Sequence, residues 1–139
     1  MELAWTKWFT ICKLKFEDIP KEPRVYEVRW AINGKPQRIN RLNGTDESGL
    51  LYIGVTANLQ SRIKNFWRRI NGGKSPHTAG HTFVAYNFER KIKLEHLEVR
   101  WAKLSNEELD KTEAALLEDY IKKFLDKPPL NLIVKRKKI

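Results

Sequence analysis

Two tyrosines and one arginine are the residues of this chain whose types and spacing suit chemistry on a phosphate group. Tyr26 and Tyr52 each lie in a short apolar segment, and Arg62 follows Tyr52 by ten residues. A guanidinium binds phosphate oxygens in a planar fork, and a phenol can orient or deprotonate a water molecule. Residues 48–88 contain no Asp or Glu that would repel an anion. The pattern predicts a site that holds and cleaves a phosphodiester.

Two strands must position the tyrosines. Residues 25–32 are rich in β-branched and aromatic side chains and predict a strand. The favoured hairpin dipeptide Asn-Gly follows it. Residues 50–55 predict a second, apolar strand. Because side chains alternate along a strand, Tyr52 and Gly54 are expected to face one way and Leu51 the other.

A helix must position the arginine. Thr56 can cap a helix that runs to about Ile70. At about 100° per residue, Arg62 falls at the edge of the apolar stripe, where a guanidinium can lean over a pocket. The cations on and after this helix are candidate contacts to a phosphate backbone. They are Lys64, Arg68, Arg69 and Lys74.

The histidines are weaker candidates. Pro76 and Gly80 predict a loop over residues 74–81. Within it, His77 is a candidate auxiliary hydrogen-bond donor or acid near the phosphate. Two histidines four apart, such as His77 and His81, can bind a metal on a helix, but a loop with no third ligand argues against this.

A half-exposed strand over residues 97–101 and a last helix follow. Ser105 and Glu108 have the spacing of a capping box, and the helix is expected from Asn106 to about Leu125.

Glu113 falls inside the apolar stripe of this last helix. An unpaired carboxylate turned into a core costs several kcal/mol or more, roughly. It is tolerable if it reaches a metal, a cation or a pocket, or if it extends to the surface. Glu118 lies roughly 140° away around the helix and is the reserve candidate for a metal ligand. The other stripe positions are Leu109, Leu116, Leu117, Tyr120 and Phe124.

Composition bounds the class of protein. The 139 residues predict a single domain with a basic tail at 133–139, and the net charge of +10 points to a polyanionic partner. No apolar run approaches the ~18 residues that span a bilayer, and no signal peptide is evident, so a cytoplasmic location and no membrane partner are expected. A single Cys12 excludes an internal disulfide. Trp5 and Trp8 are expected to be core or dimer-contact aromatics rather than base-stacking platforms.

Over residues 22–132 the chain resembles the GIY-YIG nuclease superfamily. Five pieces occur in the family's order. They are the first signature at 22–26, with Arg24 in place of glycine, the second signature Leu51-Tyr52-Ile53-Gly54, Arg62, Glu113, and Asn131 in a Pro-x-x-Asn context.

The resemblance implies an α+β domain with a small, mainly antiparallel, three-stranded sheet flanked by helices. It implies a metal-dependent DNA endonuclease in which Glu113 binds Mg²⁺ or another divalent cation such as Mn²⁺. Arg62 would clamp the phosphate, and Asn131 would brace the site. Tyr26 would act as base with Tyr52 in support, or the two roles would be reversed. No small-molecule cofactor is expected.

Departures from the family pattern motivate other interpretations. Val55 stands where some relatives carry lysine, and Phe66 where some carry histidine or tyrosine. The substitutions at Arg24 and Val55 motivate a second interpretation, a catalytically decayed nucleic-acid-binding module. A structural subunit that meets RNA is a third interpretation. The sequence does not fix DNA specificity, biological pathway or oligomeric state, a homodimer included.

Overall fold

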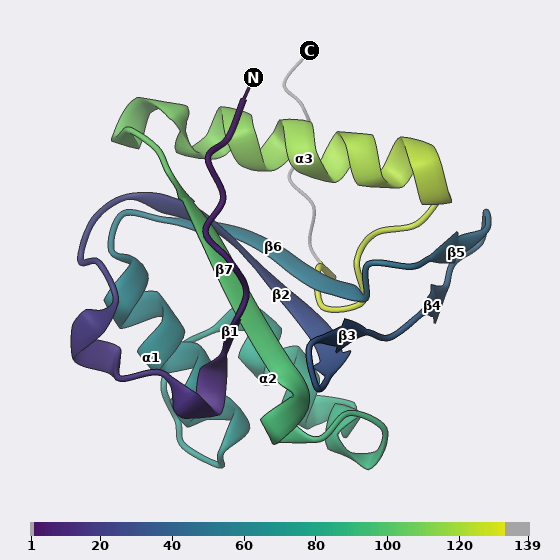
Figure 1. Ribbon diagram of the computed structural model, residues 1–139, viewed down its shortest axis with the longest axis horizontal. Helices are drawn as coiled ribbons and strands as arrows, with labels where there is room; N and C mark the ends of the chain where they lie inside the picture. Colours follow the sequence, from purple (N-terminus) through teal and green to yellow (C-terminus); the bar gives the residue numbers. More distant parts are fainter. Residues whose placement is uncertain (1, 133–139) are drawn as a thin grey trace.

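Two helices cover one face of a twisted antiparallel sheet, and a third helix covers the other (Figure 1). The structure is a computed structural model that describes residues 2–132, so the predicted basic tail at 133–139 lies outside the described residues. Helices α1 (Leu59–Ile70) and α2 (Thr78–Ala85) lie on the first face. Helix α3 (Leu109–Phe124) lies on the second. The molecule is therefore α+β, as the sequence predicts.

Three long strands form the centre of the sheet. Strand β2 (Arg24–Ile32) lies between β6 (Leu50–Thr56) and β7 (Leu97–Lys103) and pairs antiparallel with both. The expectation of three strands is too low, because two short edge strands, β1 (Phe9–Thr10) and β3 (Lys35–Pro36), extend the sheet to five. A separate ribbon consists of β4 (Ile39–Asn40) and β5 (Thr45–Asp46).

A β-bulge changes the direction of one side chain beside Tyr52. Val28 pairs with Tyr52 and Arg29 pairs with Leu50, so Leu51 is an extra residue in β6. Leu51 therefore belongs to the same apolar cluster as Tyr52. The prediction that these two side chains face opposite ways is wrong, because strict alternation fails where a bulge interrupts the ladder.

The starts of both helices on the first face differ from the sequence prediction. Asn58, not Thr56, caps α1, and its side chain accepts a hydrogen bond from the Ser61 N–H at 3.1 Å. Helix α2 occupies part of the predicted loop and begins after His77, whose ring caps it. Gly80 favours this packing despite its low helix propensity, since a Cβ there would lie 3.0 Å from the Arg69 side chain.

The last helix begins as predicted. Ser105 and Glu108 form the capping box, a 3-10 turn spans Asn106–Glu108, and α3 continues from it. Leu117, Tyr120 and Phe124 pack on the sheet with Leu50 and Ile53 of β6.

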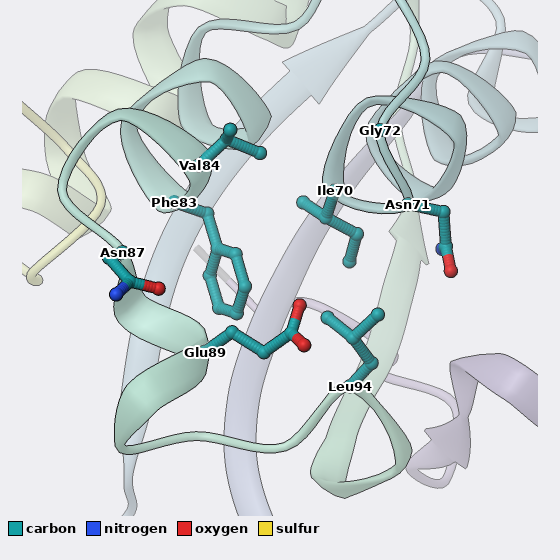
Figure 2. Close-up of a pocket in the computed structure, with 8 residues that line it drawn as sticks. All are labelled: Ile70, Asn71, Gly72, Phe83, Val84, Asn87, Glu89 and Leu94. Carbon is teal, nitrogen blue, oxygen red and sulfur yellow. The ribbon is translucent and has the colours of Figure 1, made fainter.

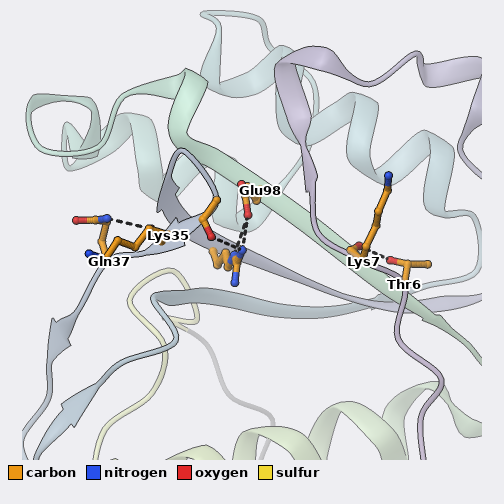
Figure 3. Close-up of polar contacts among 7 residues, drawn as sticks. Thr6, Lys7, Lys35, Gln37 and Glu98 are labelled. Atoms are coloured by element: carbon orange, nitrogen blue, oxygen red, sulfur yellow. Dashed lines mark hydrogen bonds and ion pairs between the residues drawn. The ribbon is translucent and has the colours of Figure 1, made fainter.

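Strand β7 is more buried than the sequence predicts, because the N-terminal segment runs alongside it (Figure 1). Arg29 binds Glu98 at 2.7 Å, and Arg100 binds Glu27 at 2.6 Å, so the charged face of the strand is neutralised by cross-strand pairs. Figure 3 shows the bonds that reach Glu98.

The two N-terminal tryptophans stack on those arginines. The guanidinium carbon of Arg100 lies 4.3 Å from the Trp5 ring centroid, and that of Arg29 lies 4.3 Å from the Trp8 centroid. Cation–π contacts of this kind, partly desolvated, stabilise the segment on the sheet. Both rings are half-buried and pack on the sheet, and whether they also meet a partner stays a prediction.

Candidate active site

The two tyrosines lie side by side on the sheet face that α1 and α2 cover. Tyr26 is fully buried and Tyr52 nearly so, with ring centroids 5.8 Å apart. Gly54 lies opposite Tyr26 across the ladder. A Cβ at Gly54 would lie 2.6 Å from the Tyr52 ring and 2.8 Å from the Tyr26 hydroxyl. The rings can converge because this position carries no side chain.

His77 joins this pair and its protonation state follows from its partners. The Gly80 N–H donates to His77 Nδ1 at 3.1 Å, so Nδ1 carries no proton. Burial, reinforced by the charge of Arg62, lowers the pKa of His77 to about 3, so the ring is neutral at pH 7. The single ring proton therefore resides on Nε2, which lies 3.0 Å from the Tyr26 hydroxyl oxygen. His77 thus donates to Tyr26, and Tyr26 keeps its own proton for another acceptor.

The imidazole also packs on Phe66, with ring centroids 5.0 Å apart. His77 is buried behind Tyr26 and is neutral, so it does not fit the predicted role of an acid. Its one N–H donates to Tyr26, so a direct contact with the phosphate stays a prediction.

Arg62 projects from α1 toward both phenols. One of its guanidinium nitrogens lies 3.5 Å from the Pro76 carbonyl oxygen, immediately before His77. Burial is the largest effect on both phenols and raises the pKa of Tyr26 and of Tyr52. The charge of Arg62 acts in the opposite direction on both. The net pKa of both phenols is raised, because burial exceeds the lowering effect of the Arg62 charge. Both phenols are protonated at neutral pH.

Of the two candidate metal ligands, Glu113 is the one whose charge affects a site tyrosine. It is half-buried on α3, and its negative charge raises the pKa of the Tyr52 phenol. Glu118 is directed elsewhere, since it pairs with Lys122 at 2.9 Å.

The residues that could hold a metal are few. Within residues 2–132 no three His, Cys, Asp or Glu side chains come together as a metal centre, which also leaves a His77–His81 site without a third ligand. Mg²⁺ keeps several of its waters and can be held by one or two carboxylates. Glu113 alone therefore fits a hydrated ion of this type.

Asn131 holds the strand that carries Tyr52. Its side-chain oxygen accepts from the Ile53 N–H at 2.9 Å, and its side-chain nitrogen donates to the Ile53 carbonyl at 2.9 Å. Asn131 and Ile53 are both buried. The side chain therefore ties the segment after α3 to the residue between Tyr52 and Gly54.

The four predicted phosphate-contacting cations differ in their surroundings. Arg68 and Lys74 are exposed, whereas Lys64 and Arg69 are half-buried. Arg69 already has a partner, because its guanidinium donates to His81 Nδ1 at 2.7 Å. Arg68 and Lys74 are the better placed of the four to meet a polyanion.

Gly80 is the site residue that the sequence interpretation did not identify as one. It supplies the N–H that fixes the His77 tautomer, and it allows α2 to approach α1. The sequence signal is the run His77-Thr78-Ala79-Gly80, but a glycine close to Pro76 predicts a loop rather than a helix start.

Comparison of the chain with protein-family models, with curated proteins and with solved structures yields no significant match. In the part of the chain that the structure describes, no helix combines the length and the apolar character needed to cross a membrane.

Proposed function

We propose that this chain is a metal-dependent DNA endonuclease of the GIY-YIG type. The observation that carries the proposal is the convergence of Tyr26, Tyr52, Arg62 and His77 on one face of the sheet, with the charge of Glu113 acting on Tyr52. These groups come from β2, β6, α1, the start of α2 and α3. The net charge of +10 supports a polyanionic substrate.

Phosphodiester hydrolysis requires a positioned water, stabilisation of the charge that develops on the phosphate, and assistance to the leaving oxygen. The guanidinium of Arg62 would bind the phosphate oxygens beside the two phenols. Glu113 would hold the divalent cation, Mg²⁺ or Mn²⁺. The ion, when bound, would supply Lewis-acid stabilisation and would lower the pKa of nearby groups, against the effect of burial on the phenols.

The positions of the protons on His77 and on the two phenols determine what each phenol can do. Tyr26 receives the His77 N–H and can direct its own O–H at the attacking water or at a phosphate oxygen. To act as a base, either phenol must first lose its proton, which burial opposes. The His77 donor stabilises a Tyr26 phenolate more than a neutral phenol. Tyr26 is therefore our preferred base and Tyr52 its hydrogen-bonding support, with the reversed assignment as the alternative.

A plasmid-nicking assay tests the proposal. Wild-type protein with supercoiled DNA and Mg²⁺ should produce nicked product, and EDTA should abolish it. Glu113→Gln keeps the shape of the side chain but removes the charge, so the rate should fall by about 100-fold or more. Glu118→Gln is the matched control on the same helix and should cleave normally. No cleavage by the wild type over a panel of duplex and branched substrates, or an equal rate in Glu113→Gln, would overturn the proposal.

A binding module without catalysis is the second candidate. Full burial of Tyr26 and the raised pKa of both phenols favour it, because a protonated phenol is a poor base. Its signature is tight binding without cleavage in both the wild type and Glu113→Gln. Competition between duplex DNA and structured RNA would identify the nucleic acid, and preference for the RNA would favour the structural-subunit interpretation.

A further inference from the structure

We propose that a cavity lined by Trp30, Leu51 and Tyr86, on the same sheet face as the tyrosines but separate from them, binds an unpaired base of the substrate strand. The inference depends on the proposed function only for its ligand class, a nucleic acid. The cavity has a volume of about 290 Å³. Its apolar interior includes Trp30 and Leu51, and its rim includes Tyr86, Phe88, Arg90 and Lys91.

The side chains of this cavity are those that bind single-stranded nucleic acid. Such sites combine aromatic rings, on which bases stack, with cations that meet the phosphates. Tyr86 is 62% exposed, unusual for a large aromatic ring and suited to stacking on a ligand. The Lys91 ammonium lies 5.9 Å from the Trp30 ring centroid, and Arg90 lies at the same rim. An aromatic surface and two positive charges thus occur together.

The indole of Trp30 lines this apolar site. Its N–H is buried and has no hydrogen-bond partner among the described residues. A buried donor without a partner is uncommon in folded proteins. Because this nitrogen is shielded from solvent, recognition of a base would come from the exposed Tyr86 ring and the two cations rather than from the indole N–H.

Two other cavities have the wrong charge for this ligand. The neighbouring cavity of about 420 Å³, between the ends of α1 and α2, contains Glu89 with Asn71 and Asn87 and no cation (Figure 2). The cavity of about 430 Å³ beside α3 has one lining cation, Lys123, against the acidic residues Glu27, Asp46, Glu47 and Asp119. Acidic groups repel a phosphate backbone. Of the three cavities, only the one at Trp30 has cations and no acidic side chain.

The position of the cavity relative to the tyrosines suits one continuous strand. Trp30 follows Tyr26 by four residues on β2 and packs against the same apolar cluster. At about 3.3 Å per residue, the two positions lie roughly 13 Å apart. About four stacked nucleotides span that distance, and fewer are needed in an unstacked strand. A substrate with an unpaired base near the cleaved bond, such as a bulge or a flap, would engage both sites.

Binding without metal tests the inference independently of cleavage. Fluorescence anisotropy in EDTA would compare three labelled duplexes: fully paired, with a single-base bulge, and with an abasic residue at the bulge. The base bulge should bind about tenfold tighter than the other two, because only it offers a ring to stack. The abasic bulge separates recognition of the base from recognition of the bend.

Variants identify the cavity. Tyr86→Ala removes an exposed ring, so the fold should persist, and the preference for the base bulge should fall to about twofold or less. Val84→Ala is the control, since Val84 is also exposed, lies on α2 and lines the neighbouring cavity. Equal affinity for the base and abasic bulges, or an unchanged preference in Tyr86→Ala, overturns the inference. Nicking activity without base preference overturns this inference alone, and base preference without nicking overturns the proposed endonuclease alone.

Discussion

Gly54 determines whether the two site tyrosines can converge. Substitution by Ala would place a methyl group 2.6–2.8 Å from both rings, and the neighbouring β2 backbone leaves little room for relief. We expect Gly54→Ala to lower the free energy of unfolding by about 1–3 kcal/mol, as overpacking of a core does. Urea unfolding measures that change, and the nicking assay should show lost cleavage.

Gly44→Ala is the control for this substitution. Gly44 has a φ of +83° but nothing within 4 Å of its Cβ position, so only backbone strain of about 1 kcal/mol is expected there, with normal cleavage. Stability and activity of Gly54→Ala equal to the wild type would contradict the steric account.

Residue spacing brought Tyr26, Tyr52 and Arg62 together in the prediction, and the structure places them together. The protonation of these groups could not be predicted in the same way. It depends on burial, which exceeds the effect of the Arg62 charge on both phenols. It depends also on the Gly80 N–H, a backbone donor that fixes the His77 tautomer and that no residue type reveals.

The segment after α3 stabilises β6 through one side chain. Asn131→Ala would remove both hydrogen bonds to Ile53 and leave its buried N–H and carbonyl without partners. Since each such group costs about 1–3 kcal/mol, we expect a loss of roughly 2–4 kcal/mol in the free energy of unfolding. Urea unfolding measures it.

Asn71→Ala serves as the comparison. That amide donates to the Trp67 carbonyl at an exposed helix end, so its removal should cost about 0.5–1 kcal/mol. Similar losses in the two variants would mean that Asn131 does not act as the brace of β6.

Elements with a clear period were predicted well, and elements set by distant contacts were not. The periods of β2, β6, α1 and α3 follow from their own residues, and each lies close to its expected range. Helix α2 depends on capping by His77 and close packing of Gly80 on Arg69. The burial of β7 depends on Trp5 and Trp8, more than 90 residues earlier along the chain. Such contacts leave no local pattern in the sequence.

The net charge of the whole molecule predicts salt-dependent binding of DNA. Each phosphate contact that is lost should reduce the slope of log K against log salt by about 0.9. Arg68→Ala with Lys74→Ala should therefore reduce the slope by about 1.8 if both residues contact phosphates. Anisotropy titrations between low and moderate salt measure the slope. Lys122→Ala is the control, because it removes a cation already paired with Glu118, and it should leave the slope unchanged. A change in slope equal to that of the double variant would mean that any lost charge has the same effect.

The acid sensitivity of the fold should depend on His77. Its pKa is about 3 in the folded protein and about 6.5 in the unfolded chain. Between these values the unfolded chain binds more protons, so the stability that the neutral ring contributes is complete above pH 6.5 and declines as pH falls toward 3. The decline has a limiting slope of about 1.4 kcal/mol per pH unit.

Comparison with His77→Asn isolates this effect, because Asn is also a good N-cap but does not titrate. Urea unfolding at pH 7.5, 5.5 and 4.5 would measure the free energy of unfolding of both proteins. Carboxylates and the net charge affect the two proteins alike, so the stability of the wild type minus that of the variant should decrease steadily as the pH falls. Parallel curves would mean that the ring accepts a proton in the folded state as readily as in the unfolded one. Because that proton would add at Nδ1, the bond from the Gly80 N–H would be lost, and with it the contact that fixes the His77 tautomer proposed to support Tyr26.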